Sequence, residues 1–499
     1  MNRLSTAGLG FTRTGMPSRC DRFHPLCYTE SVKAISGGEN LPYIQPKKRR
    51  PSPAHILPAS FLAAILTGAL LLSLPAAAAD GASAGWSTAL FTATTSVCVT
   101  GLVVVDTFSY WSPFGKAVIL GLIQVGGLGI IASYALLMLL LRRRFSLADR
   151  ALLQDAFNLD TRTGVIAFLE RVFRGTLLAE GAGALLYSFC FVPVYGPFRG
   201  ILLSVFTSVS AFCNAGIDLF GPDSLAPFAG NLPVLFITMA LIILGGLGYV
   251  VWFGISDTVR SGVRRGYPPL RILSRLGEHV KLVLLLTAAL IAGGACFFFL
   301  CERQNPLTLG ALPLPQQLTG ALFESVTLRT AGFSSFPQSA LTAPSSLAAC
   351  VLMFVGGSPV GTAGGVKTVT AFFVIQNALS YIRRQKETVV CRRRVPEELM
   401  RRSAAIVSVS LGAVLLLTAA LLLAMPVSAA DAFFEIVSAC GTVGLTRGIT
   451  SSLNTAGRII VMLGMYLGRI GPISMAVFFV RPAGKEQKVT HAAGRFFVG

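Results

Sequence analysis

Four short segments of the sequence each end in a glycine that follows small or polar residues, and they are the first candidates for chemistry. The glycines are Gly101, Gly216, Gly332 and Gly444, and the differences between successive positions are 115, 116 and 112 residues. A period this regular predicts one structural unit that occurs four times. Long apolar runs flank each unit, so we expect four loops that meet around one axial pore.

Backbone oxygens are the chemical groups that such loops can offer. A cation such as potassium crosses hydrocarbon only where oxygen dipoles replace its hydration shell, and rings of backbone carbonyls can do this. Glycine permits the backbone angles that turn successive carbonyls inward, and a preceding short helix would point its partially negative end at the cation. The pattern predicts a cation pore, against the alternative that the glycines only allow close helix packing. The predicted ion-binding residues are Cys98, Val99, Thr100, Gly101, Cys213, Asn214, Ala215, Gly216, Arg329, Thr330, Ala331, Gly332, Gly441, Thr442, Val443 and Gly444.

Composition indicates that the elements around these loops lie in a bilayer. Hydrophobic residues make up 53% of the chain and charged residues 13%, and the mean hydropathy is +0.68. Apolar runs that reach the roughly 20 residues of a spanning helix predict an all-α polytopic membrane protein. The predicted spans are His55–Leu74, Val118–Leu141, Gly175–Val194, Pro233–Phe253, Val280–Leu300, Leu347–Ile375, Ile406–Met425 and Ile459–Val480. Shorter stretches between the members of each pair are predicted to be re-entrant pore helices: Trp86–Ser96, Gly200–Ala211, Leu318–Thr327 and Asp431–Ala439.

Basic residues predict the orientation of the chain. Lys and Arg cluster before the first span and after every second span, so the clusters fall on one side, which the positive-inside tendency makes cytoplasmic. We expect a plasma (inner) membrane protein with both termini cytoplasmic. The net charge of +20 could instead indicate nucleic-acid binding, but the basic residues are divided among several loops. The predicted parts are a basic cytoplasmic N-terminal arm (1–52), four repeats (53–145, 146–258, 259–385 and 386–482) and a cytoplasmic C-terminal tail (483–499).

Residue sets typical of enzymes are not recognisable in the sequence. The four histidines and ten cysteines lack the paired spacing of a zinc site and the partners of a catalytic triad, so we interpret the cysteines as free thiols. The stretch before Lys367 is not a phosphate-binding loop, because Val366 separates Gly365 from that lysine. A membrane enzyme and a purely structural scaffold therefore fit less well than a transporter, and no cofactor is expected in this chain.

The four segments resemble the filter loops of the Trk/Ktr/HKT potassium-transporter superfamily. The resemblance rests on Thr94–Thr107, Ser208–Gly216, Leu328–Phe333 and Ser438–Leu445, with further matches at Ile123–Gly129 and Gly468–Pro472. Within the superfamily the chain is most similar to membrane subunits of the KtrB/TrkH type. The resemblance implies potassium uptake by permeation, with a sodium-coupled or sodium-conducting member of the same superfamily as the alternative.

The same resemblance implies partners for the chain. It implies a homodimer in contact with membrane lipids, no nucleic acid, and a cytosolic ring of nucleotide-binding regulatory subunits of the KtrA/TrkA type. The basic loops Arg260–Arg275 and Tyr381–Arg402 offer a docking face for that ring, or act only as topology determinants.

A gate is also implied, because in this superfamily the second outer helix of repeat three is interrupted just below the filter. The corresponding stretch is Gly356–Gly365, in which five of ten residues are glycine and one is Pro359, a composition that opposes a continuous helix. A kinked packing helix is the alternative. The implied gate residues are Gly356, Gly357, Ser358, Pro359, Val360, Gly361, Thr362, Ala363, Gly364, Gly365, Lys367 and Arg469.

Several charged side chains fall within the predicted membrane region, where an unpaired charge is costly. Arg329 could hold its filter loop through carbonyls or limit ion occupancy. Arg469 either approaches the gate, as the resemblance implies, or pairs with a buried acid such as Glu435. Glu180 is expected to be a paired or snorkelling acid, and Lys367 to extend toward the cytoplasm. Weak attraction of cations is predicted for the acids on the outer side and the pore helices, Asp106, Asp218, Glu324 and Asp431.

Overall fold

A computed structural model describes residues 53–140, 164–385, 387–391 and 393–471. The described residues all belong to one compact unit, 52–499. The predicted N-terminal arm and C-terminal tail lie outside the described residues.

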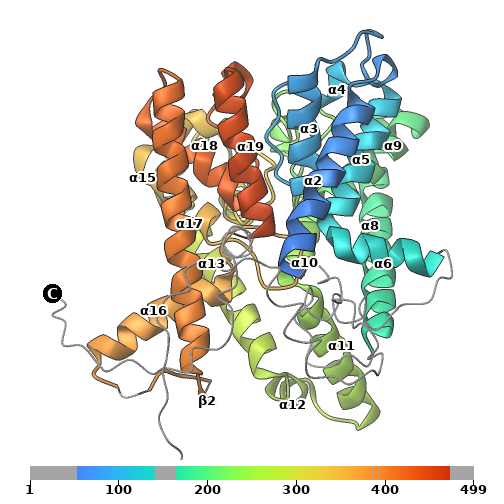
Figure 1. Ribbon diagram of the computed structural model, residues 1–499. Coiled ribbons are helices and arrows are strands. Elements are labelled where there is room, and N and C mark those ends of the chain that lie inside the picture. Colours follow the sequence, from blue (N-terminus) through green and yellow to red (C-terminus); the bar gives the residue numbers. More distant parts are fainter. Residues whose placement is uncertain (1–52, 141–163, 386, 392, 472–499) are drawn as a thin grey trace, which may run out of the picture. The chain divides into compact units, whose positions relative to one another are not determined.

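The chain forms four successive groups of helices, each with a long helix, a short pore helix and a second long element (Figure 1). Repeat 1 contains α2 (Pro53–Leu72), α3 (Trp86–Cys98), α4 (Thr107–Tyr110), α5 (Pro113–Leu128) and α6 (Ile130–Leu140). Repeat 2 contains α8 (Val165–Tyr195), α9 (Pro197–Cys213) and α10 (Leu232–Leu247). Helix α11 (Tyr249–Arg264) crosses the predicted boundary with repeat 3, and α12 (Pro269–Ser274) follows it. Repeat 3 contains α13 (Glu278–Glu302), α14 (Leu314–Thr327), α15 (Ala343–Phe354) and α16 (Thr368–Ile382), and repeat 4 contains α17 (Glu397–Ala424), α18 (Ala429–Gly441) and α19 (Thr455–Ile470).

Little other regular structure is present in the described part of the chain. Single 3-10 turns lie at Pro75–Ala77, Ala226–Phe228, Gln338–Ala340 and Thr450–Ser452. The strands β1 (Val389–Val390) and β2 (Arg393–Arg394) form a small antiparallel ladder between repeats 3 and 4. The all-α expectation is therefore confirmed, and the four expected pore helices are α3, α9, α14 and α18.

Local sequence signals explain where the second helices begin. Asn231 and Asn454 cap α10 and α19 by accepting backbone N–H groups, and Ser112 does the same for α5. Proline stands in the first turn of α5, α9, α10, α14 and α15, where its missing N–H costs nothing. These signals place the helix starts independently of the surrounding fold.

The second helix of repeats 1, 2 and 3 is interrupted, which the sequence predicted only for repeat 3, and the described part of the second helix of repeat 4 ends at the same kind of glycine. Gly129, Gly248 and Gly471 end α5, α10 and α19 with φ values of +87°, +86° and +91°. A left-handed residue cannot continue a right-handed helix, and α10 and α11 are bent by 95° at this point. The predicted spans Val118–Leu141 and Pro233–Phe253 are thus each two helices, and Leu347–Ile375 is two helices as expected. Residues 472–480 of the last predicted span lie outside the described residues.

Because of these breaks, fewer single helices are long enough to cross a membrane than the apolar runs of the sequence predict. Among the described residues, three helices are long and apolar enough, Ile166–Tyr195, Glu278–Glu302 and Glu397–Ala424, and the bent pair α10–α11 makes a fourth. The eight predicted spans are therefore not all single helices, because a glycine break divides an apolar run without changing its hydropathy.

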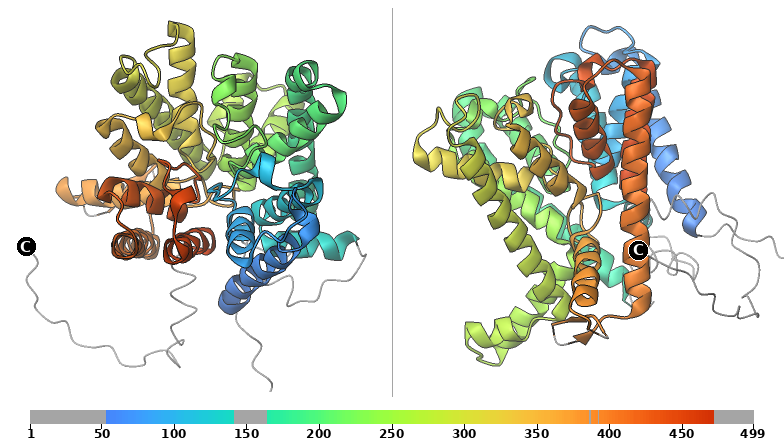
Figure 2. Two further views of the ribbon diagram at one scale, coloured as in Figure 1. Left: turned by 90° about the horizontal axis from the view of Figure 1, so that it is seen from above. Right: turned by 90° about the vertical axis from the view of Figure 1, so that its left-hand side faces the viewer.

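The repeats pack in a closed cycle. The second helix of each repeat contacts the pore helix of the next: α5 with α9, α10 with α14, α15 with α18, and α19 with α3. Viewed from above, the four groups surround a common centre (Figure 2). Since repeat 4 returns to repeat 1, all four pore helices are held by the same kind of neighbour.

Candidate ion-binding site

The four predicted glycines lie together at the centre of this cycle. Each has a positive φ, from +65° at Gly216 to +99° at Gly101. A Cβ atom added to any of them would collide with the carbonyl oxygen of the residue that precedes the glycine of a neighbouring repeat. The pairs are Gly101 with Ala215, Gly216 with Ala331, Gly332 with Val443, and Gly444 with Thr100. The four contacts close a ring, so glycine is needed here for its backbone angle and for its lack of a side chain.

A second left-handed residue precedes each glycine by two positions. The φ values are +56° at Val99, +58° at Asn214, +71° at Thr330 and +51° at Thr442. Such angles cost a non-glycine residue roughly 1–2 kcal/mol. Because the same costly angle recurs in all four repeats, we attribute it to a shared requirement of the loop and not to one local turn.

Hydroxyl groups in the last turns of the pore helices tether the loops. Each repeat has one such bond: Gly101 N–H to Thr95 Oγ1 (3.0 Å), Ser210 Oγ to Ile217 O (2.5 Å), Thr327 Oγ1 to Phe333 O (2.6 Å) and Gly444 N–H to Ser438 Oγ (3.1 Å). All four hydroxyls are buried. The pore helices also end at these loops, so their negative ends lie beside the glycine ring.

Unpartnered polar side chains gather in the same loops. Thr100 Oγ1, Thr330 Oγ1, Thr442 Oγ1 and both amide atoms of Asn214 are buried and have no hydrogen-bond partner among the described residues. Buried polar groups normally have a partner, so each loop has a polar side chain available to a bound ion or water. The donor set is oxygen-rich and fits a monovalent cation.

An outer cavity of about 360 Å³ opens on one side of the ring. All four glycines line it, together with Asp106, Asp218, Asp223 and Arg447. Burial raises the pKa of the Asp218 carboxyl to about 6, although hydrogen bonds from the Ser224 hydroxyl and the Phe220 N–H oppose the shift. The acids here outnumber the single arginine, so the cavity attracts cations, and more strongly above that pH, where Asp218 is charged as well.

The predicted gate segment lies directly against the opposite side of the loops. Cβ atoms added to Gly364 and Gly356 would contact Thr442 and Thr330, respectively. The segment is well bonded: Ser358 N–H donates to Gly246 O (3.0 Å) and Thr362 N–H to Gly245 O (3.2 Å). We expected a continuous helix to be impossible here, and the structure agrees, because α15 ends at Phe354 and α16 begins at Thr368.

Arg469 reaches this segment from repeat 4. Its guanidinium donates to the carbonyls of Thr362, Gly126 and Gly127. Glu435 instead accepts from the hydroxyls of Thr446 and Thr450, so the alternative of an ion pair between Arg469 and Glu435 is excluded.

Lys367 also lies against this segment, and whether it extends toward the cytoplasm stays a prediction. Its Nζ donates to Ala363 O at 2.6 Å. It lines, with Arg469, Tyr249 and Val360, an inner cavity of about 210 Å³. Two cations therefore face the space beneath the gate segment.

Other charged residues take roles that the sequence did not specify. Arg329 is buried, but its side chain makes no hydrogen bond to a filter carbonyl within the described residues, and its Nε has no partner. The predicted bracing by Arg329 is thus not found. Glu180 is buried and accepts from Gln124 Nε2 (3.2 Å) and Cys213 Sγ (3.7 Å), so it is paired, but with neutral groups. Asp431 is paired with Arg447 at 2.6 Å.

Sequence reasoning missed the glycines that support the pore helices from behind. Cβ atoms on Gly126, Gly245 and Gly468 would collide with the carbonyls of Val97, Phe212 and Cys440, in the last turns of α3, α9 and α18. The repeated Gly-Gly-Leu-Gly at 126–129 and 245–248 was the available signal.

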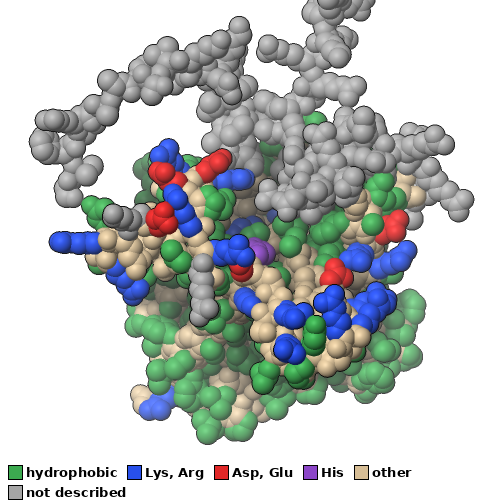
Figure 3. Space-filling view, turned by 90° about the horizontal axis from the view of Figure 1, so that it is seen from below, with side chains coloured by type: hydrophobic (Ala, Val, Ile, Leu, Met, Phe, Trp, Pro, Cys, Tyr) green, Lys and Arg blue, Asp and Glu red, His purple; other side chains and the backbone are tan. Residues whose placement is uncertain are grey.

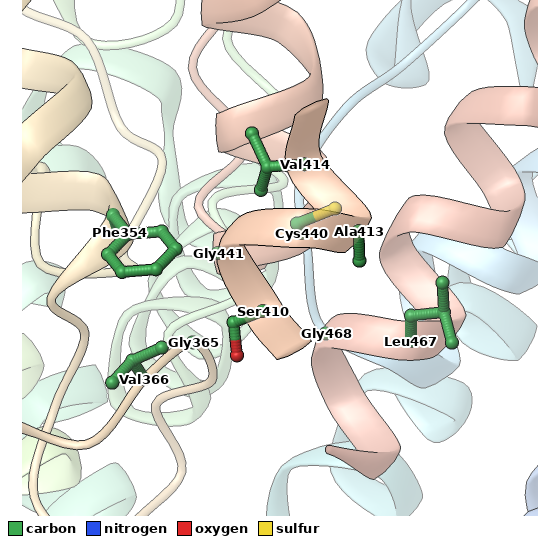
Figure 4. A pocket seen from close by; sticks show the side chains of 10 residues that line it. All are labelled: Phe354, Gly365, Val366, Ser410, Ala413, Val414, Cys440, Gly441, Leu467 and Gly468. Atoms are coloured by element: carbon green, nitrogen blue, oxygen red, sulfur yellow. The ribbon is translucent and has the colours of Figure 1, made fainter. Parts of the chain in front are cut away.

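A narrow crevice of about 30 Å³ lies behind the fourth loop (Figure 4). Phe354 and Val366 approach it from the gate segment side, Val414 from α17 and Leu467 from α19, around Cys440. Its volume suits about one water molecule.

This architecture defines a class of four-repeat membrane proteins in which pore loops meet at a central ring of backbone oxygens. The chain belongs to the TrkH family of cation transport proteins, whose family profile matches residues 40–489. It is accordingly a membrane transport protein.

Individual relatives agree with this assignment. The chain is 35% identical over 448 residues to Ktr system potassium uptake protein B of Bacillus subtilis (strain 168), covering 90% of this chain and 97% of that protein. It is 36% identical over 429 residues to the protein of the same name in Vibrio alginolyticus, covering 86% and 91%. It is 33% identical over 444 residues to potassium/sodium uptake protein NtpJ of Enterococcus hirae, covering 88% and 95%.

A solved structure shares the fold. The crystal structure of the potassium transporter TrkH from Vibrio parahaemolyticus aligns with a TM-score of 0.67 at 15% identity, covering 87% of this chain and 86% of that one. The expected repeat fold is thereby confirmed.

Proposed function

We propose that the chain is a potassium-uptake membrane subunit with one permeation path through the four-loop filter. The observation that carries the proposal is the closed ring in which every filter glycine faces a carbonyl of a neighbouring repeat. Rings of backbone carbonyls replace the hydration shell of potassium. The names of the relatives, potassium uptake proteins, support the choice of ion.

The electrochemical gradient supplies the energy for uptake. An inside-negative potential favours inward movement of a cation by about 2.3 kcal/mol per 100 mV. With the outer cavity facing outward, Asp106, Asp218 and Asp223 raise the local cation concentration before the filter. In this orientation both termini are cytoplasmic.

The interrupted segment 356–365 is the gate in this proposal. It lies against the loop residues Thr330 and Thr442, where any outward shift of its backbone changes access to the filter. Arg469 and the carbonyls of Gly245 and Gly246 hold it in the position described. These hydrogen bonds are specific polar contacts, so opening of the gate requires that they break together.

Assembly with a regulatory ring and a second copy of the chain completes the proposal. Lys and Arg side chains gather on the face shown in Figure 3. Arg393 and Arg394 are already paired with Glu278 and Glu387. The ring therefore docks mainly through α11 and α12, whose arginines have no ion-pair partner among the described residues: Arg260, Arg264, Arg265, Arg271 and Arg275.

Sodium coupling is the second candidate function. One relative is named a potassium/sodium uptake protein, and the filter loops contain different side chains in each repeat, so the ring is not fourfold symmetric in chemistry. Flux measurements in proteoliposomes separate the two. Potassium uptake that proceeds at full rate without sodium supports the first function, and a strict requirement for sodium supports the second.

Growth is a simpler test of the same proposal. Expression of the chain in a strain that lacks potassium uptake should restore growth at low potassium. Failure to restore growth, with the protein present in the membrane, would reject potassium uptake.

A further inference from the structure

Two cations surround one aromatic ring at the filter-mouth end of repeats 1 and 2. Lys116 Nζ lies 5.0 Å from the ring centroid of Phe108, and the guanidinium carbon of Arg199 lies 4.9 Å from the same centroid. Arg199 also lies 5.5 Å from the ring of Tyr195. The lysine belongs to α5 and the arginine to α9, which pack against each other. Two like charges are thus held close together at a junction between repeats.

One acid, Asp106, interacts electrostatically with Lys116. Neither cation takes part in any ion pair among the described residues. Asp106 is nearby in sequence but is committed to capping α4, where its oxygens accept from Phe108 N–H (3.2 Å), Ser109 N–H (3.0 Å) and Ser109 Oγ (2.6 Å). Asp106, which also caps α4, therefore offsets part of the repulsion, and the pair of cations keeps an excess of positive charge.

The positions of the two cations on their helices add to the electrostatic cost of holding them there. Lys116 lies in the first turn of α5 and Arg199 in the first turn of α9. Cations are unfavourable at helix N-termini, where the helix dipole is already positive. The two side chains are thus held in a place that an external anion would stabilise.

Exposed apolar side chains lie close to Arg199 in the sequence, on α8 and α9. Phe198 is 87% exposed, Val194 65% and Ile201 52%. In a bilayer such side chains contact acyl chains, and aromatic residues gather at the headgroup level. An anion that fits both surroundings carries a phosphate group and acyl chains in one molecule.

We propose that Lys116 and Arg199 form a binding site for the phosphate headgroup of an anionic phospholipid. The headgroup bridges α5 and α9, while the acyl chains cover the apolar side chains of α8 and α9. The lipid thereby fastens repeat 1 to repeat 2 beside the pore helix α9. This site is independent of which cation the protein transports.

Lipid retention tests the proposal directly. The detergent-purified full chain is incubated with phosphatidylglycerol, with phosphatidylcholine or with inorganic phosphate, and bound lipid and thermal stability are measured. We expect phosphatidylglycerol to bind and to raise the melting temperature, with little effect from the other two probes. The double variant K116Q/R199Q should lose at least half of the retained phosphatidylglycerol and most of the added stability.

A matched control separates this site from general surface charge. Arg303 is exposed, follows α13 and has no ion-pair partner among the described residues, so R303Q should bind phosphatidylglycerol like the unmodified chain. R199K should retain most of the binding, because it keeps the charge. Each variant is first checked for a monodisperse size-exclusion profile.

Three results would overturn the proposal. Equal retention of the two phospholipids would mean that only apolar contact is involved. Equal stabilisation by inorganic phosphate and phosphatidylglycerol would mean a site for a soluble anion. Unchanged retention in the folded double variant would mean that the two cations bind no lipid.

Discussion

Arg469 of α19 donates a hydrogen bond to the carbonyl oxygen of Thr362, in the segment that interrupts the second helix of repeat 3. The same guanidinium donates to the carbonyls of Gly126 and Gly127 at the end of α5. One side chain of repeat 4 thus connects the backbones of repeats 1 and 3. This link is positioned to hold the proposed gate in place.

Removing this link should increase potassium flux without changing ion preference. A hydrogen bond to a charged group contributes about 1.5–3 kcal/mol, so Arg469→Ala should raise the open fraction by roughly tenfold. Fluxes in proteoliposomes measure the effect. Arg458→Ala is the matched control, because Arg458 lies on the same helix but donates to Leu453 O and Ser87 Oγ. A fall in selectivity in Arg469→Ala would place the arginine in the filter instead.

Deletion of several residues from 356–365 should act in the same direction as Arg469→Ala. The filter glycines pack on one another, so the loops keep their shape when the segment is shortened. Potassium flux should rise while the preference for potassium over sodium is retained. Low flux in a folded deletion variant, or loss of preference, would show that the segment is structural.

Substitution of a filter glycine should alter ion preference. Gly216→Ser places a Cβ atom 2.5 Å from the Ala331 carbonyl oxygen, so the ring must widen and sodium permeation should rise relative to potassium. Backbone strain at a positive φ adds a stability cost of about 1–3 kcal/mol. Gly81→Ser controls for that strain, because Gly81 has a φ of +71° and no atom within 4 Å of an added Cβ. Equal ion preference in both variants would remove Gly216 from the filter.

Gly245, which packs behind the pore helix α9, should tolerate no side chain. Gly245→Ala would drive a Cβ atom into the Phe212 carbonyl and to 2.7 Å from Thr362 Oγ1. Overpacking of this kind costs about 1–3 kcal/mol, which thermal unfolding in detergent would detect. Gly293→Ala on α13 meets no atom within 4 Å and should leave the melting temperature unchanged or slightly higher. Similar values for both variants would contradict the packing role of Gly245.

Apparent potassium affinity should weaken as the outer pH falls through about 6. The pKa of Asp218 is raised to about 6 by burial, so its carboxylate is charged above that pH and neutral below it. Loss of the negative charge reduces cation attraction in the outer cavity. Asp218→Asn should show the weaker affinity of the low-pH form at both pH 7.5 and pH 5 (roughly one unit or more on either side of the pKa). An unchanged pH profile in this variant would assign the dependence to another group.

Ring docking through α11 should depend on unpaired arginines. Arg264→Gln together with Arg265→Gln should weaken co-purification of the regulatory subunit, with the larger effect at low salt. Arg401→Gln is the control, since Arg401 is exposed but already paired with Glu397. Equal binding by all variants across salt concentrations would leave these arginines as topology determinants.

Much of this protein was predictable from the sequence because its signals are local or periodic. The four filter glycines recur at a regular spacing. The pore helices coincide with apolar stretches that are too short to span a bilayer. A glycine that needs a positive φ and a cap such as Asn454 depend on nearby residues alone. Hydropathy likewise placed the chain in a membrane without reference to the fold.

Only the tertiary structure decided which distant residues meet. The sequence could not tell whether Arg469 pairs with Glu435 or reaches the gate, because more than 100 residues separate Arg469 from Thr362. It also missed the breaks at Gly129 and Gly248, since hydropathy is unchanged where a helix turns. The closed ring itself depends on all four repeats packing in a cycle, and such long-range contacts leave no mark on local composition.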